Sequence, residues 1–438
     1  MTEPAWDFPA SRALYERARA VIPGGSTRQS VFYRPHPLYA VAGEGCRVRF
    51  VDGHEALDFH NNFTSLVLGH GHPAVLSAAH ARLDSGVALG APTEPEIELA
   101  ELLAGRFAGV EQVVFCTTGS EAIMLGIRLA RAVTGRAGVA KFEGGYHGGY
   151  DHAKVSGMVG PDGWGDELEP ESVPDTGGLP PRVAAEVHVA RFNSLPSLRR
   201  VLDRHGDRIG VLVLEPVLGA GGMIPPEPGF LAEVRRLTRR LGIVLLCDEV
   251  ITQRLAVGGG QEKYGVVADL TVVSKVSGNG FPISALGGSR ALMAPLDGSG
   301  RDGPAVYHSG TYNANPLSVA VSLATLRTLD AELIGHLDRL GELARGGLRE
   351  RFAARGVPAV VTGTGSLFNV HFTTRPPTDY RGVRGADRQR LAEFHRQLLR
   401  GGVLLAGRGM GCISAPMVAA DVATLLRATD KALSELGW

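Results

Sequence analysis

The chain has 438 residues, of which 44% are hydrophobic and 21% charged, and its formal net charge is zero. This length exceeds what one compact core usually organises, so we expect a large domain and a smaller one. The balanced charge argues against nucleic acid as the main partner. The apolar runs are too short to cross a bilayer, and residues 1–19 lack the layout of a signal peptide. We therefore expect a cytoplasmic protein that binds neither nucleic acid nor a membrane.

The four cysteines lie far apart and form no C-x-x-C pair. This spacing favours reduced thiols over a disulfide or a zinc site, and no metal site is predicted. Almost all basic residues are arginines. Chemistry that needs a primary amine is therefore restricted to a few lysines: Lys141, Lys154, Lys263, Lys275 and Lys431.

Residues 1–65 open with a helix, pass through a turn at Pro23–Gly25 and reach a hairpin-like piece that closes at residues 51–53. We assign this segment to the smaller domain.

Residues 66–329 alternate short apolar runs with stretches of helical period, which predicts an α/β domain with a mostly parallel sheet. Continuous apolar runs at 243–248 and 270–275 are typical of strands covered on both faces. The Gly- and Pro-rich stretch 160–181 predicts a long surface loop, of a kind that often forms a lid or is disordered. The other predicted elements are strands at 113–116 and 209–215 and helices at 121–134 and 229–241.

Residues 330–438 predict a smaller α+β domain. We expect helices at 331–355, at 387–400 and from residue 420 onward, with strand-like segments at 359–373 and 403–414.

Three polar residues stand at the ends of predicted strands: Glu215, Asp248 and Lys275. Ligands of open α/β sheets bind at the carboxyl ends of the strands. Burial lowers the pKa of a lysine and makes its amine a nucleophile for aldehydes. A neighbouring aspartate can pair with a protonated pyridine nitrogen and keep that ring an electron sink. The pattern fits a pyridoxal 5′-phosphate (PLP) site; a buried Lys–Asp ion pair without chemistry is the alternative.

Two glycine-containing segments add to this site. Residues 117–122 (TTGSEA) lie between a strand and a helix, where backbone N–H groups and hydroxyls can bind a phosphate. Taken alone, the same residues are a common helix cap. In residues 143–149 (EGGYHGG), glycines let the backbone approach a ligand and Tyr146 offers a stacking face. An ordinary loop is the alternative there.

In combination and in order, these pieces resemble the class III, fold-type I family of PLP-dependent aminotransferases over nearly the whole chain. The resemblance implies a large domain of mostly parallel sheet flanked by helices, a smaller α+β domain, and PLP as the cofactor. The matching segments are residues 52–53, 58–59, 68–73, 119–131, 145–148, 215–217, 248–250, 274–282 and 308–316.

The resemblance assigns cofactor roles to this chain. It implies that Lys275 forms the Schiff base with PLP and moves the proton between substrate and cofactor, and that Asp248 pairs with the pyridine nitrogen. Tyr146 is expected to stack on one face of the ring and Val250 to pack on the other. Glu215 is expected to be a positioning residue near the cofactor.

The same resemblance implies a homodimer with the active site at its interface. Gly119 and Ser120 are expected to bind the phosphate from one subunit, and Thr311 to reach it from the second.

Within the family, the chain is most similar to the branch of glutamate-1-semialdehyde aminomutase and the β-phenylalanine aminotransferases. Residues 23–28 (PGGSTR), 248–255 (DEVITQRL) and 406–410 (AGRGM) lean toward the latter. Arg28 and Arg408 are therefore expected to bind a substrate carboxylate, which suits the bidentate guanidinium fork. A surface arginine is the alternative for Arg408.

The chain also departs from the family pattern. Ser274 precedes the lysine where the family has Gly, and Asn279 interrupts a glycine run, so Asn279 is expected to border the substrate. Residues 218–222 (LGAGG) lack an Asn that the aminomutases carry. These departures weigh against a plain glutamate-semialdehyde reaction.

We therefore expect an aminotransferase that acts on an amino acid whose amino group is β to the carboxylate, aromatic members included. A keto acid such as 2-oxoglutarate or pyruvate would be the amino acceptor. The alternatives are an aminomutase, another PLP reaction (racemisation, decarboxylation or carbon–carbon bond formation) in secondary metabolism, and a non-catalytic binding module. Intact Lys275 and Asp248 weigh against the last.

Overall fold

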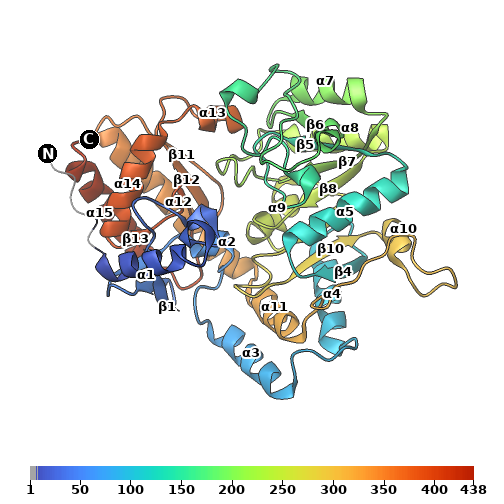
Figure 1. Ribbon diagram of the computed structural model, residues 1–438, viewed down its shortest axis with the longest axis horizontal. Coiled ribbons are helices and arrows are strands. Elements are labelled where there is room, and N and C mark those ends of the chain that lie inside the picture. Colours follow the sequence, from blue (N-terminus) through green and yellow to red (C-terminus); the bar gives the residue numbers. More distant parts are fainter. Residues whose placement is uncertain (1–5, 7) are drawn as a thin grey trace.

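A computed structural model describes residue 6 and residues 8–438. Figure 1 shows two bodies side by side: a larger one built around a central sheet, and a smaller one that contains both the first helix, α1 (Pro9–Arg19), and the last, α15 (Ala419–Glu435). No helix within the described part of the chain is both long and apolar enough to cross a membrane.

The larger body contains a seven-stranded sheet of order β4-β10-β9-β8-β7-β5-β6. Strand β10 runs antiparallel to both of its neighbours, and the other pairings are parallel. This arrangement confirms the predicted α/β fold. The strands are β4 (Gln112–Cys116), β5 (Gly138–Phe142), β6 (Val187–Ala190), β7 (Ile209–Leu214), β8 (Val244–Asp248), β9 (Leu270–Val273) and β10 (Ser284–Gly288).

Helices cover both faces of this sheet. Because side chains alternate along a strand, Val211 and Val213 of β7 pack on the face of α5 (Gly119–Thr134). Leu212 and Leu214 pack on the other face, against α7 (Leu195–His205) and α8 (Phe230–Leu241). Burial on both faces explains why these strands read as continuous apolar runs. The remaining helices of the larger body are α3 (Pro73–Ser85), α4 (Glu94–Arg106), α6 (Pro181–Ala185), α9 (Gly259–Tyr264), α10 (Arg290–Met293) and α11 (Pro316–Thr328).

The smaller body brings the two ends of the sequence together. Strand β3 (Glu55–Asp58) pairs in parallel with β13 (Val403–Leu404), so that Leu57 lies opposite Val403 in one four-stranded sheet, β1-β2-β3-β13. A second sheet has the order β11-β12-β14. The other elements are β1 (Ala40–Glu44), β2 (Arg47–Phe50), β11 (Val360–Thr362), β12 (Leu367–His371), β14 (Met410–Cys412), α2 (Asn61–Thr64), α12 (Ala331–Ala354), α13 (Tyr380–Arg384) and α14 (Arg388–Arg400).

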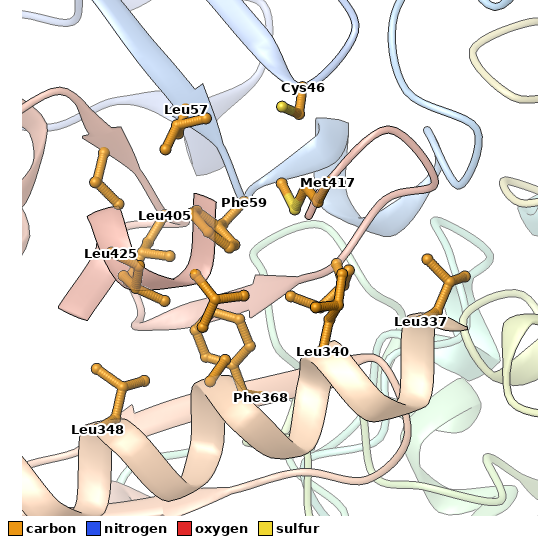
Figure 2. Packing of buried hydrophobic residues seen from close by; sticks show 14 of the residues in the cluster. Cys46, Leu57, Phe59, Leu337, Leu340, Leu348, Phe368, Leu405, Met417 and Leu425 are labelled. Carbon is orange, nitrogen blue, oxygen red and sulfur yellow. The ribbon is translucent and has the colours of Figure 1, made fainter. Parts of the chain in front are cut away.

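A large hydrophobic cluster in the smaller body contains residues from both ends of the sequence. Figure 2 shows α12 directing Leu337, Leu340 and Leu348 toward Phe59, which comes from the N-terminal segment. C-terminal residues such as Leu425 of α15 complete the cluster. The N-terminal segment thus shares its apolar surface with the C-terminal third of the chain.

One predicted segment differs in the structure. The strand expected to end at Lys275 ends at Val273, because the chain turns there to return as the antiparallel strand β10; Lys275 lies in the turn with φ of 39°. The stretch 160–181 is a loop, as predicted, that contains the short helix η4 (Pro161–Gly163). Within it, Asp175 accepts backbone hydrogen bonds from Gly157 and Met158 at 2.8 Å. Short bridges also pair Gly165 with Pro170.

Candidate active site

The carboxyl ends of three adjacent parallel strands bring the predicted polar residues together. Leu214 of β7 lies opposite Cys247 of β8, and Asp248 lies opposite Val272 of β9. Glu215, Asp248 and Lys275 therefore meet at the same edge of the sheet, which is where α/β sheets bind ligands.

Asp248 is held by a histidine that the sequence analysis had not assigned to it. His147 Nδ1 lies 2.9 Å from Asp248 Oδ2, and both residues are buried. The other carboxylate oxygen accepts a hydrogen bond from the backbone N–H of Val250 at 3.1 Å. Asp248 is thereby fixed in orientation at the end of β8.

Glu215 fixes the loop that carries Tyr146. Its two carboxylate oxygens accept hydrogen bonds from the backbone N–H groups of Tyr146, at 3.1 Å, and Gly219, at 3.0 Å. Burial raises the pKa of Glu215; the His147 side chain opposes this shift, and Asp248 reinforces it. The Tyr146 ring stays 47% exposed, as a group that stacks on a ligand must.

The N-terminus of α5 has two backbone N–H groups left for a phosphate. Glu121 accepts hydrogen bonds from the backbone N–H groups of Thr117 and Thr118 at 2.8 Å, and the Thr118 hydroxyl caps the helix. The N–H groups of Gly119 and Ser120 have no partner within the helix, because they belong to its first turn. They are oriented for an anion, which the helix dipole favours.

Glycines bring two further segments close to this helix end. A Cβ at Gly119 would come within 3.3 Å of Val250 Cγ2, and one at Gly148 would overlap Ser120. The Ser120 hydroxyl accepts a hydrogen bond from the Gly149 N–H at 2.9 Å. The helix end, the Tyr146 loop and Val250 therefore line one site.

Lys275 sits in this charged environment with a lowered pKa. Burial is the main cause; the negative charge of Asp248 opposes it, and the positive charge of Arg408 adds to it. A lowered pKa increases the fraction of neutral, nucleophilic amine at a given pH.

Arg28 and Arg408 lie in one region, near His60. The pKa of His60 is lowered to about 4, mainly by burial; the negative charge of Asp58 opposes this shift, and the positive charges of Arg408 and Arg28 add to it. Arg28 Nη1 lies 2.5 Å from the amide oxygen of Asn62. The Arg408 guanidinium lies 5.6 Å from the centre of the Phe63 ring. Among the described residues, neither arginine has an acidic partner within ion-pair distance.

Asn279 uses its amide on the protein backbone. Its oxygen accepts a hydrogen bond from the Leu68 N–H at 2.9 Å, and its nitrogen donates to the Gly69 carbonyl at 3.3 Å. The side chain is 5% exposed. Its visible role is to attach residues 68–69 to the turn after Lys275, and a substrate contact stays a prediction.

Thr311 lies on an exposed segment that also presents Tyr307 and Tyr312, which are 72% and 64% exposed. Large exposed aromatic side chains are typical of interfaces. The reach of Thr311 into a second subunit stays a prediction.

Lys141 is a second buried amine near the site. It lies on β5, is 1% exposed, and donates hydrogen bonds to the carbonyls of Gly145, at 3.0 Å, and Val155, at 2.5 Å. Burial lowers its pKa to about 8. The sequence did contain a signal for Lys141, because lysines are few in this chain and an ammonium group in an apolar strand needs hydrogen-bond acceptors.

The described residues contain no group of three or more His, Cys, Asp or Glu side chains that could hold a metal ion. All four cysteines are free and buried.

The residues at this edge match the chemical groups of PLP one by one. The α5 N-terminus suits a phosphate, Asp248 suits a protonated ring nitrogen, Tyr146 suits the ring face, and Lys275 suits the aldehyde. Together with the sheet order, they define a fold-type I PLP-dependent enzyme.

The chain belongs to the class III aminotransferase family: the family model described as aminotransferase class-III matches residues 29–427, and the cofactor is PLP. A curated relative, glutamate-1-semialdehyde 2,1-aminomutase of Methanothermobacter thermautotrophicus, is 37% identical over 97% of this chain and 99% of its own. An ω-transaminase from Sphaerobacter thermophilus is 40% identical, with a TM-score of 0.92 over 98% of each chain. A β-phenylalanine aminotransferase from Variovorax paradoxus is 32% identical, with a TM-score of 0.88 over 98% of this chain and 94% of the other.

Proposed function

We propose that this enzyme is an aminotransferase that takes the amino group from a β-amino acid and passes it to a keto acid. The observation that carries the proposal is the pair Arg28 and Arg408, two guanidinium groups near His60 that have no acidic partner among the described residues. Arg408 also lies close enough to Lys275 for its charge to lower the pKa of that lysine. An uncompensated guanidinium suits a substrate carboxylate. The similarity to a β-phenylalanine aminotransferase supports the β position.

Each residue of the proposed cofactor site has a separate role. The N–H groups of Gly119 and Ser120 hold the phosphate, Asp248 keeps a proton on the ring nitrogen, and Tyr146 and Val250 hold the ring from its two faces. PLP, when bound, supplies an electron sink for the bonds around the amino-bearing carbon. Lys275 Nζ would remove the proton from that substrate carbon and carry it to the cofactor.

Arg28 and Arg408 are proposed to fix the position of the substrate carboxylate relative to Lys275. A carboxylate held by these arginines fixes where the amine can lie relative to Lys275, and a β-amino acid has one more carbon between the two groups than an α-amino acid. This positioning converts binding energy into orientation of the reacting carbon.

The enzyme is proposed to work as a homodimer. The exposed aromatic residues Tyr307 and Tyr312 flank Thr311 and would be buried by a second subunit. Thr311 of that subunit would then complete the phosphate site.

An aminomutase is the second candidate, because the curated relative at 37% identity is a glutamate-1-semialdehyde 2,1-aminomutase. A mutase moves the amino group within one molecule and needs no keto acid.

The test uses purified, PLP-loaded protein with β-phenylalanine and either 2-oxoglutarate or pyruvate. The expected products are glutamate or alanine, together with 3-oxo-3-phenylpropanoate and the acetophenone that it forms by loss of CO₂, all measured by mass spectrometry. Lys275→Ala is the inactive control. Conversion of glutamate-1-semialdehyde without an acceptor, and no product from any β-amino acid, would establish the mutase instead.

A further inference from the structure

The segment Asn61–Thr64 has an unusual backbone. Its four residues have φ angles of 46°, 47°, 56° and 73°, and none of them is glycine. A left-handed conformation costs an L-residue roughly 1–2 kcal/mol, so four in succession need support from their surroundings. Strained backbone of this kind is found preferentially at functional sites.

Buried contacts hold this left-handed turn in place. The Asn61 backbone N–H donates a hydrogen bond to Asp58 Oδ1 at 2.7 Å, and the Asn61 side-chain amide donates to the Cys412 carbonyl at 3.0 Å. Arg254, which is fully buried, donates to the Thr64 carbonyl at 3.2 Å and to the Ser366 hydroxyl at 2.8 Å. The turn is therefore fixed at both ends by groups that water does not reach.

The middle of the turn contacts both arginines of the proposed carboxylate site. Asn62 accepts a hydrogen bond from Arg28 at 2.5 Å, while its own amide nitrogen donates to the Ser65 hydroxyl at 3.2 Å. The next residue, Phe63, places its ring under the guanidinium of Arg408. Two consecutive side chains thus orient two cations that come from distant parts of the sequence.

We propose that Asn62 is the positioning residue for Arg28, and that it makes the site selective for carboxylate-bearing substrates. This inference rests on the proposed function of Arg28. An amide oxygen can hold a guanidinium in place without cancelling its charge, whereas a carboxylate at the same position would form an ion pair with it. The neutral partner leaves Arg28 oriented and available to an anionic substrate.

The discriminating variant is Asn62→Asp, which keeps the size of the side chain and supplies the competing charge. We expect its KM for β-phenylalanine to rise tenfold or more, with kcat within twofold of the wild type. For 1-phenylethylamine, which lacks the carboxylate, KM should stay within twofold. Asn62→Gly, which tolerates the positive φ and adds no charge, should raise KM for β-phenylalanine by less than Asn62→Asp does.

The matched control is Gln112→Glu, which adds the same charge at an exposed position at the start of β4, away from the carboxyl edge of the sheet. It should leave both KM values unchanged. If Asn62→Asp leaves KM for β-phenylalanine within twofold, or raises KM equally for both amines, the inference is wrong.

A binding measurement separates this inference from the proposed reaction. Calorimetric titration with 3-phenylpropanoate, which has the carboxylate but no amine, should give binding to the wild type and to Gln112→Glu, weakened at least tenfold in Asn62→Asp. If the wild type forms no keto acid from β-amino acids, the proposed function fails while this titration still decides the role of Asn62. Equal binding by all three proteins, or no binding to the wild type, would overturn the inference.

Discussion

His147 Nδ1 and Asp248 Oδ2 lie 2.9 Å apart, and both side chains are buried at the carboxyl edge of the central sheet. His147 follows Tyr146 on the loop after β5, and Asp248 is the last residue of β8. Their contact couples the loop that carries Tyr146 to the carboxylate proposed to face the ring nitrogen. His147 therefore fixes the orientation of Asp248 at the end of β8.

Replacement of Asp248 by Asn keeps this geometry and removes the charge. Without a carboxylate to keep the ring nitrogen protonated, the electron sink weakens, and we expect kcat to fall by on the order of 10²–10³-fold. Steady-state kinetics would measure this loss, and the absorbance of bound PLP would show that the cofactor is retained. A fall of less than threefold in a cofactor-loaded variant would contradict the role given to Asp248.

Cofactor capture by the apoprotein should depend on pH through Lys275. Only the neutral amine attacks the aldehyde, and burial lowers the pKa of this lysine below its usual 10.5. The rate of PLP capture should therefore rise with pH, and the midpoint of this rise should lie below pH 10.5. Stopped-flow absorbance of the apoprotein mixed with PLP would measure this profile. Lys263, whose amine donates a hydrogen bond to Asp338 of α12 at 3.3 Å, offers a matched Lys→Ala control that should leave the profile unchanged.

A buried ion pair joins the smaller body to the loop of the cofactor site. Glu143 Oε2 lies 2.8 Å from Arg381 Nε, and the two side chains are 1% and 9% exposed. Removal of one partner leaves an uncompensated buried charge, so Arg381→Ala should cost about 3–5 kcal/mol of stability. Thermal unfolding followed by circular dichroism would measure the loss.

The double variant Glu143→Gln with Arg381→Ala provides the control. It removes both charges and should recover part of the stability lost in Arg381→Ala. A double variant that is less stable than the single one would show that the unpaired charge is not the cause.

Acid should destabilise the protein through two buried histidines. Burial lowers the pKa of His371 and of His395 to about 4. Both stay neutral in the folded protein at pH values where the unfolded chain, with a pKa near 6.5, binds a proton. Their contribution is complete above pH 6.5 and is lost as the pH falls from 6.5 toward 4.

Urea unfolding at pH 7.5, 6 and 5 would measure this effect in the wild type and in His395→Gln. The variant should lose less stability over that interval. Equal slopes for both proteins would exclude His395 as a contributor.

Complementation between subunits would test the proposed dimer. Lys275→Ala and Thr311→Ala should each impair the site in their own homodimers. In a mixed dimer, one site would combine an intact Lys275 with an intact Thr311 from the other subunit, and up to half of the wild-type activity per dimer should return. Co-expression with two affinity tags would isolate the mixed dimer; no gain over the Thr311→Ala homodimer would contradict a shared site.

The sequence alone identified the sheet, the cofactor and the residues at the strand ends. Continuous apolar runs such as Val244–Asp248 record burial on both faces, and a polar residue at the end of such a run marks the edge where ligands bind. The motifs around Lys275 and Gly119 added the family. These features are local in the chain, so the apolar runs reveal the strands, and the resemblance of short motifs to a known family implies the cofactor site.

The contacts that orient the site arise between distant residues, and only the tertiary structure decided them. Asn62 contacts Arg28, which lies 34 residues away in the sequence, and His147 contacts Asp248, which lies 101 residues away. In the turn at Asn61–Thr64, only the two asparagines give a local signal, because Asn tolerates left-handed φ. The contacts that Arg254 and Cys412 make with this turn come from distant parts of the chain. The parallel pairing of β3 with β13 likewise joins the N-terminal and C-terminal parts of the chain. The local sequence pattern thus determines the helices, the strands and the reactive residues at their ends. Packing between distant segments determines which charged side chains are paired and which remain available to a substrate.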